Sequence, residues 1–390
     1  MEKSGQLKKV IEVFQRFLLL GCTSFGGPAA HLGYFRKVFV DEQKWINQEG
    51  YSRLIALSQF LPGPGSSQVG FALGMRHAGI AGGIAAFLGF TLPSFLLLYA
   101  LALSSDLQQN YPLIEGAVHG LKLFAVVVVA DAVLSMQKSF CTERTTLGIA
   151  VITAVFLLAF PSLITQMLVL IGAAVCGLFL HKSDSESHTV QTIPRTGNGY
   201  LALFLLLFLA LPFLANHSKW FSLIADFYHS GSLVFGGGHV VLPLLQQSLG
   251  GLLDQSTLLF GYSAAQAVPG PMFTLASYFG AQLSSDNMLA GALLATLAIF
   301  LPGFLLLIGL YKRWEIIARI PKLAGAIWGI NASVVGLLLA ALYQPVFTSA
   351  VTSAIDMGMV VSGFYLLRVF KVPVIIMVFG FSVAGVVQFI

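Results

Sequence analysis

The sequence predicts an all-α polytopic membrane protein built from two inverted-topology repeats of about six helices each. Of its 390 residues, 57% are hydrophobic and only 9% are charged, whereas a soluble domain carries about 25% charged residues. The charge-free runs 288–311 and 372–390 are each long enough for a helix of about 20 residues to cross a bilayer. In addition, one set of sequence landmarks occurs twice along the chain in the same order.

The first half predicts six helices, of which two are broken. The first covers about 10–32 and is interrupted at Ser24-Phe25-Gly26-Gly27-Pro28, and the second covers about 53–76 and is interrupted at Pro62-Gly63-Pro64. Proline removes a backbone donor and clashes with the preceding turn, and glycine adds backbone freedom, so a regular helix cannot continue through either stretch. Four unbroken helices are expected over 79–103, 116–137, 145–160 and 162–181.

A polar, Ser/Thr-rich stretch from Lys182 to Asn198 has the composition of a linker, and one further helix is expected over 199–215. The sequence therefore divides into an N-terminal repeat (1–181), a linker with its connecting helix (182–220) and a C-terminal repeat (221–390).

The landmarks of the first half return in the second at an offset of about 207 to 210 residues. The matched pairs are Phe235-Gly236-Gly237-Gly238 with residues 25–28, Pro269-Gly270-Pro271 with residues 62–64, Leu301-Pro302-Gly303-Phe304 with Leu92-Pro93-Ser94-Phe95, and residues 325–331 with 116–122. Self-similarity in a fixed order indicates an internal duplication.

The distribution of Lys and Arg residues among the loops predicts how the chain is oriented in the membrane. With thirteen crossings (twelve remaining an alternative) and a cytoplasmic N-terminus, the loops expected inside carry Arg76, Lys138, Arg144, Lys182, Arg195, Lys312, Arg313, Arg319, Lys322, Arg368 and Lys371. This is the distribution that the positive-inside rule requires, and the odd connecting helix inverts the second half. The loop that holds Arg36, Lys37, Lys44 and Arg53 departs from this rule, because thirteen crossings place it on the external side of the membrane. Re-entry of the first helix therefore stays open as an alternative.

Paired breaks in corresponding halves point to a transport site. The second half-helices start near Pro28, Ser66, Gly238 and Met272. Each start exposes backbone N–H groups without intrahelical partners and carries the positive end of the helix dipole, so converging starts would bind an anion. The breaks contain no Asp or Glu, which a cation site would need. The alternative is that Gly and Pro only kink tightly packed helices.

Most of the predicted substrate-binding residues lie at or beside the breaks, and two, Lys122 and Asn331, lie on the helix 116–137 and its second-half counterpart. The predicted residues are Ser24, Gly26, Gly27, Gln59, Pro62, Gly63, Pro64, Ser66, Ser67, Lys122, Gly236, Gly237, Gln266, Pro269, Gly270, Pro271, Thr274 and Asn331.

Ionisable residues within spans are costly and are therefore functional candidates. Lys122 either supplies a positive charge for a dianion or reaches the outer interface by snorkelling. His31, Asp131 and His239 are candidates for proton coupling. The alternatives are a packing role for each histidine and an ion pair with a neighbouring helix for Asp131.

The sequence gives little support to other classes of protein, such as disulfide-rich, metal-binding, nucleic-acid-binding or enzymatic ones. Three unpaired cysteines exclude a disulfide framework and a thiolate metal site, and the sequence implies no cofactor. The basic pI near 9.1 reflects membrane orientation, so the expected partners are the lipid bilayer and an oxyanion, with no nucleic acid; a homodimer is left open. An intramembrane enzyme would need a motif such as HExxH or a paired-Asp arrangement, and neither is present. A passive anion channel stays open as a rival to a carrier.

Residues 22–31, Cys22-Thr23-Ser24-Phe25-Gly26-Gly27-Pro28-Ala29-Ala30-His31, and residues 59–64 resemble the signatures of the chromate ion transporter (CHR) family. Residues 235–238 and 266–271 resemble that family's second-half copies, and the resemblance covers nearly the whole chain except the linker. It implies a long-chain, two-repeat carrier of the bacterial inner membrane. Such carriers export chromate, a sulfate-like tetrahedral oxyanion, by using the proton motive force, and so confer chromate resistance. One departure is the loop 245–255, which lacks the basic, Trp-containing stretch usual in the family.

Overall fold

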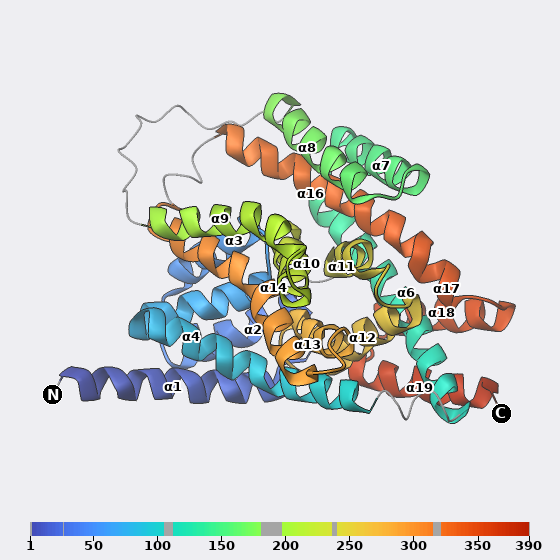
Figure 1. Cartoon of the computed structure of the whole chain (residues 1–390), viewed down its shortest axis with the longest axis horizontal. Helices are drawn as coiled ribbons and strands as arrows, with labels where there is room; N and C mark the ends of the chain where they lie inside the picture. Colours follow the sequence, from blue (N-terminus) through green and yellow to red (C-terminus); the bar gives the residue numbers. More distant parts are fainter. Residues whose placement is uncertain are drawn as a thin grey trace.

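The computed structural model of the chain describes residues 2–25, 27–104, 112–180, 197–235, 240–314 and 321–389. Every regular element within these ranges is a helix (Figure 1). Five helices are long and apolar enough to cross a membrane, over 65–103, 115–140, 198–215, 288–310 and 322–350. Three further apolar helices are shorter, over 144–159, 164–180 and 374–388. The predicted class of helical membrane protein is thus confirmed, whereas the number of crossings is not fixed by these lengths.

The longer helices of the two halves follow a similar order, and α9 (Asn198–Ala215) joins the halves. The first half consists of α1 (Glu2–Thr23), α2 (Gly27–Phe35), the π-helix η1 (Arg36–Glu42), α3 (Gln48–Phe60), α4 (Gly65–Leu103), α6 (Pro112–Phe140), α7 (Arg144–Ala159) and α8 (Leu163–Leu180). The second half consists of α10 (Lys219–Leu233), α11 (Val241–Leu249), α12 (Gln255–Ala267), the short 3-10 helix η3 (Met272–Thr274), α13 (Leu275–Gln282), α14 (Met288–Leu310), α16 (Pro321–Ala341), the π-helix η4 (Leu342–Phe347), α17 (Thr348–Ala350), α18 (Ala354–Arg368) and α19 (Val374–Phe389).

A kink divides α4 into two helices that have separate counterparts in the second half. The backbone leaves the helical region at Ala78 and Gly79, and Gly79 has φ +68°, which favours glycine. Residues 65–77 correspond to η3 and α13, and residues 80–103 correspond to α14. The expected helix boundary at residue 79 is confirmed.

The breaks occur where the sequence predicts them, and for the predicted reason. Leu61 and Val268, which each precede a proline, end α3 and α12 in extended conformations. Gly63 (φ +115°) and Gly270 (φ +101°) then occupy backbone conformations that are strained for other residues. Local chemistry therefore sets both breaks.

The first broken helix doubles back as a hairpin. Phe17 of α1 stacks on Phe39 of η1 with ring centroids 4.8 Å apart and contacts Phe35 at 5.4 Å, so α2 and η1 return along α1. The ring of Trp45 then stacks on His77 at 3.9 Å. The loop before α3 therefore lies at the same end as the α4 kink, and the geometry favours the re-entry alternative over a straight crossing.

Helix α3 starts from the end where Trp45 stacks on His77, and the first part of α4 returns to that end. Since α3 begins just after Trp45 and residues 65–77 end at His77, this pair also forms a hairpin with its tip at residues 61–64. In the second half, α11 returns along α10, because the Oγ atoms of Ser230 and Ser248 lie 3.5 Å apart. These hairpins favour re-entry over the straight passages counted in the thirteen-crossing prediction.

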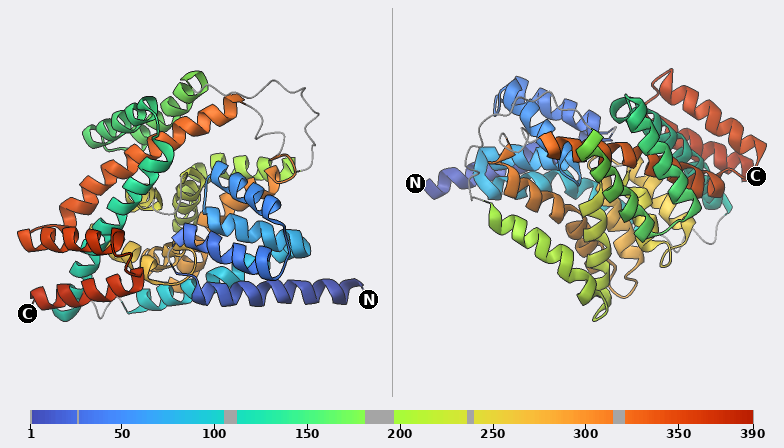
Figure 2. Two further views of the ribbon diagram at one scale, coloured as in Figure 1. Left: turned by 180° about the vertical axis from the view of Figure 1, so that it is seen from behind. Right: turned by 90° about the horizontal axis from the view of Figure 1, so that it is seen from above.

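The last two helices of each half pack on the long helix of the other half (Figures 1 and 2). Helices α7 and α8 lie along α16, and α18 and α19 lie along α6. Glycines permit the close approach: Gly120 faces the backbone of α19 near Phe381, and its equivalent Gly329 faces the backbone of α8 near Ala173. Because the exchange is reciprocal, the halves are related by a pseudo-two-fold axis.

Candidate functional site

The hairpin tips of the two halves meet through crossed backbone hydrogen bonds. The amide of Gly63 donates to the carbonyl of Val234 at 2.7 Å, and the amide of Gly270 donates to the carbonyl of Ser24 at 2.9 Å. Gly63 and Gly270 are equivalent residues of the duplication, as are Ser24 and Val234. Each Pro-Gly-Pro tip is therefore bonded to the other half's first break, as the expected convergence of the breaks requires.

Each tip also packs on the proline-containing helix of the other half. A Cβ placed on Gly63 would lie 3.1 Å from Gly303 Cα, and one on Gly270 would lie 2.9 Å from Ser94 Oγ. The Nε2 atom of Gln68 donates to the carbonyls of Pro62 at 2.9 Å and Gly303 at 3.1 Å. The helix segment around Pro302 thus contacts the hairpin tip of the first half, and the segment around Pro93 contacts the hairpin tip of the second half.

The N-terminus of α4 is buried and has no side-chain cap. Pro64 occupies the N-cap position, and the first helical backbone bond runs from the Gln68 amide to the Pro64 carbonyl. Ser66, Ser67 and Gln68 are 5%, 3% and 0% exposed. The first amides of a helix have no intrahelical acceptor, so a buried, uncapped start is prepared for an external acceptor.

Buried side-chain donors surround this helix start. Ser24 Oγ, Ser67 Oγ and His31 Nε2 have no hydrogen-bond partner among the residues that the structure describes, nor does one acceptor, Gln68 Oε1, and all four residues are at least 97% buried. His31 Nδ1 lies 3.2 Å from Ser66 Oγ, and the ring lies beside the backbone of Ser24 and edge-on to Phe90. Unpaired buried polar groups are costly, so this cluster is suited to a polar ligand.

The cluster favours an anion. Hydroxyl and imidazole N–H groups can donate, and nearby carbonyls of Ser24, Val234 and Pro62 already accept hydrogen bonds from Gly270, Gly63 and Gln68. Free donors at a helix N-terminus form an anion-binding arrangement.

The equivalent helix start in the second half is less polar. Met272, Phe273 and Thr274 stand where the first half has Gly65, Ser66 and Ser67. The Thr274 hydroxyl donates to the Pro271 carbonyl at 2.6 Å, and Gln266 Nε2 contacts Met272 Sδ at 2.9 Å. Among the described residues at the helix starts, the free donors are therefore those of the first half. This asymmetry is readable from the aligned sequences, although the sequence analysis treated both breaks alike.

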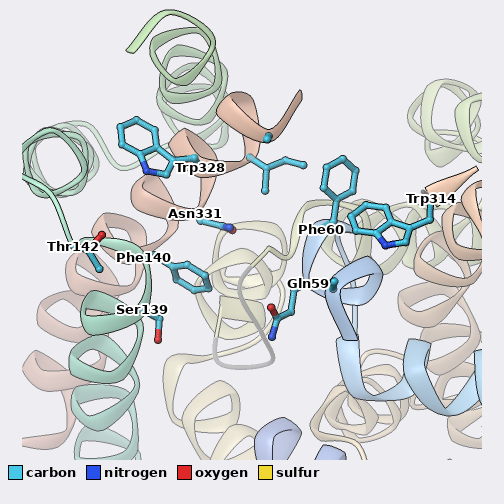
Figure 3. A pocket seen from close by; sticks show the side chains of 11 residues that line it. Gln59, Phe60, Ser139, Phe140, Thr142, Trp314, Trp328 and Asn331 are labelled. Carbon is cyan, nitrogen blue, oxygen red and sulfur yellow. The ribbon is translucent and has the colours of Figure 1, made fainter. Parts of the chain in front are cut away.

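A cavity of about 420 Å³ opens beside the first hairpin tip, between α3, the end of α6 and the start of α16. Gln59 and Asn331, both predicted site residues, lie on opposite walls, and the indoles of Trp314 and Trp328 contribute to the lining (Figure 3). Ser139 and Thr142 complete its polar lining, and no charged residue lines it. The cavity is therefore lined by Gln59, the residue three positions before Pro62 in the first hairpin tip.

Several predicted residues lie away from the tips. Lys122 Nζ donates to Ser256 Oγ at 2.7 Å, at the start of α12. Asp131 forms an ion pair with Arg368 of α18, as the alternative interpretation of Asp131 anticipated. Of the remaining predicted residues, Gly27 begins α2 with φ +75°, while Pro62, Pro64, Pro269 and Pro271 form the tips. Gly26, Gly236, Gly237 and His239 lie outside the described residues.

One buried carboxylate was missed by the sequence analysis. Asp356 is fully buried and accepts hydrogen bonds from the Thr352 and Ser353 amides and from Gln388 Nε2, each at 2.9 Å. His119 Nε2 lies 2.9 Å from its second oxygen. The network joins α6, α18 and α19 and anchors the exchanged helices. Within the described ranges, no group of three His, Cys, Asp or Glu residues could hold a metal ion.

Comparison with known proteins adds the following findings. The family model described as chromate transporter matches residues 11–178 and 221–386, once in each half. A chromate transport protein of Pseudomonas aeruginosa is 27% identical over 84% of this chain and 79% of its own length. A chromate transport protein of Cupriavidus metallidurans is 23% identical over 96% and 92%. An uncharacterized transporter of Methanocaldococcus jannaschii is 26% identical over 87% and 85%. No solved structure matches the chain.

Proposed function

This chain belongs to the chromate transporter family, and from that premise we propose that it is a secondary active transporter that exports chromate or a similar tetrahedral oxyanion. Export would be driven by the proton motive force across a bacterial inner membrane and would confer resistance to chromate. The two curated relatives named above as chromate transport proteins cover most of this chain, which supports this choice of substrate class.

The observation that carries the proposal is the buried start of α4, where free donors meet an uncapped helix end. The Ser24 and Ser67 hydroxyls can each donate one hydrogen bond to an oxyanion oxygen, and His31 Nε2 donates a third when it carries a proton. The helix dipole adds roughly half a positive charge at the same point. Donors of this kind hold an anion without a permanent counter-charge, so the site can release the anion as well as bind it.

The hairpins also support an inverted arrangement of the halves. If two broken helices in each half re-enter rather than cross, thirteen crossings become nine, which is still an odd number. The dissenting loop around Arg36 and Lys44 then moves to the cytoplasmic side, next to His77. Of the 21 Lys and Arg residues, only Lys122 and Lys219 then fall outside the cytoplasmic loops and the N-terminal helix. This arrangement fits the positive-inside rule better than the straight crossings do.

Proton coupling is assigned to His31. Of the three predicted candidates, His31 lies in the site and touches Ser66, whereas Asp131 is engaged by Arg368. The third, His239, lies outside the described residues. Protonation of the His31 ring adds a positive charge beside Ser66, so the protonation state of His31 can change how strongly the site holds an anion.

Purified protein in proteoliposomes tests the proposal. Radiolabelled sulfate or chromate should accumulate above its equilibrium level when a pH gradient is imposed, and a protonophore should abolish this accumulation. A passive channel, the closest rival, would let the anion equilibrate along its own gradient. Flux that ignores the pH gradient would therefore refute the coupled carrier, and absence of any oxyanion flux would refute the substrate class.

A further inference from the structure

The two halves differ at one pair of equivalent contacts. In the second half, α12 lies directly against α6, where the Ser263 hydroxyl donates to the Leu121 carbonyl at 2.8 Å and Lys122 Nζ donates to Ser256 Oγ at 2.7 Å. Ser263 is completely buried by this contact. The contact is therefore closed.

At the equivalent place in the first half, the cavity described above separates α3 from α16. Ala56 corresponds to Ser263, and Asn331 corresponds to Lys122. Ala56 lines the cavity and is exposed, as is Gln59. Glu49, the counterpart of Ser256, instead forms an ion pair with Arg53 of its own helix. This contact is therefore open.

The difference extends along the helix face. Leu259 and Tyr262 of α12 are fully buried, whereas their counterparts Ser52 and Ile55 of α3 are exposed and half-buried. Meanwhile the crossed hydrogen bonds of Gly63 and Gly270 are formed on both sides. The crossed backbone hydrogen bonds at the centre are thus symmetric, whereas the flanking contacts are not.

We propose that the α6–α12 contact is the closed outer gate of the transport pathway and that the α3–α16 cavity is its open inner counterpart. This inference rests on the proposed function and adds the identity of the gate. The cavity is lined by the end of α6, by Trp314 and by the first turns of α16, and the Lys and Arg residues close to these in the sequence, Lys138, Arg144, Lys312 and Lys322, are predicted to be cytoplasmic. The chain is therefore in a cytoplasm-open state, which is the state that loads a substrate for export.

If the α3–α16 side closes and the α6–α12 side opens, the protein reaches the outward-open state. Helix α3 would close on α16, and α12 would leave α6, breaking the Lys122–Ser256 and Ser263–Leu121 hydrogen bonds. Lys122 would then face the outward pathway and attract the anion as it leaves the site. Lys122 is thus a gate residue in one state and a substrate contact in the other, which reconciles its predicted role with its position.

Cysteine labelling at the equivalent positions tests the gate. Ala56→Cys and Ser263→Cys are made in a chain whose Cys22, Cys141 and Cys176 are replaced by Ser, after this background is shown to transport. A membrane-impermeant maleimide is applied to inside-out vesicles and to right-side-out cells. From the cytoplasmic side, position 56 should react at least about ten times faster than position 263, because a buried thiol reacts only after its contact opens.

A second variant probes the contact itself. Adding Ser256→Ala to the Ser263→Cys chain removes the acceptor of Lys122 and should increase labelling of position 263 from the outside. Equal labelling of the two positions, labelling of position 56 only from outside, or no effect of Ser256→Ala would overturn the gate. Because labelling is measured without substrate, these outcomes are distinct from a failure of oxyanion flux, which would overturn the proposed function instead.

Discussion

Replacement of Ser67 by Ala is the most direct test of the site at the start of α4. The Ser67 hydroxyl is 97% buried and has no partner among the described residues, so its removal deletes a donor that only a ligand would use. A hydrogen bond to a charged group contributes about 1.5–3 kcal/mol. Since about 1.4 kcal/mol corresponds to a tenfold change, oxyanion affinity should fall roughly 10- to 100-fold.

Although Ser67→Ala should weaken oxyanion binding, it should not weaken the folding stability of the ligand-free protein. An unpaired buried hydroxyl costs free energy in the folded state, so Ser67→Ala should leave the unfolding midpoint unchanged or raise it. Ser230→Ala is the matched control, because the Ser230 hydroxyl is equally buried but already donates to the Asp226 carbonyl at 2.7 Å. Its affinity for the oxyanion should match that of the wild type.

Equilibrium binding of radiolabelled sulfate or chromate to detergent-purified protein, with the KM of uptake measured in parallel, provides the assay. A Ser24→Ala, Ser67→Ala double variant should lose less than the sum of the single losses if both hydroxyls hold one ion. An affinity of Ser67→Ala within about twofold of wild type corresponds to only about 0.4 kcal/mol and would refute the placement of the site.

Three further predictions concern stability. Gly63→Ala and Gly270→Ala should each lower the free energy of unfolding by about 1–3 kcal/mol, because both positions have positive φ and close backbone neighbours; in thermal unfolding, Gly380→Ala, which has open space around it, should match the wild type. Asp356→Ala should cost about 3–5 kcal/mol, since His119 and Gln388 lose their acceptor, and an unchanged unfolding midpoint would contradict this. The hydrogen bond from Lys219 lowers the pKa of Asp286, so the contribution of this exposed pair is present at neutral pH and is lost as pH falls through the carboxylate range; Asp286→Asn should make the unfolding midpoint slightly less sensitive to acid.

The breaks were predictable because their causes are local. Proline and glycine dictate the backbone at residues 61–64 and 268–271 whatever surrounds them, and the duplication marks the two stretches as equivalent. The direction of the chain after each break was not predictable. A charge-free half-helix has the same composition whether it continues or returns, and the return is decided by tertiary contacts such as Phe17 with Phe39 and Trp45 with His77.

The partners of the ionisable residues were also beyond the sequence. Helical spacing places Glu115, His119 and Lys122 on one face of α6, but His119 meets Asp356 and Lys122 meets Ser256, both from the other half. Such pairs depend on the exchange of the terminal helices and on the packing of α12, which arise only when both halves fold together. A charge within a span therefore signalled a partner without identifying it.

The side chains that differ between the halves set the balance between the two gate states. Closure of α12 on α6 forms the hydrogen bond from Lys122 to Ser256 and brings the Leu121 carbonyl to the Ser263 hydroxyl, which also lies 2.8 Å from the Leu259 carbonyl of its own helix. Closure of α3 on α16 cannot reproduce the contact of Ser263, because Ala56 has no donor, and Asn331 is shorter than Lys122 and would meet Glu49, which already pairs with Arg53. At about 0.5–1.5 kcal/mol per hydrogen bond, the Lys122–Ser256 bond alone favours the cytoplasm-open state by about that amount in the absence of ligand. An exporter benefits from this bias, since its site then waits on the side from which the anion must be removed, and the proton gradient must supply the free energy to reverse it.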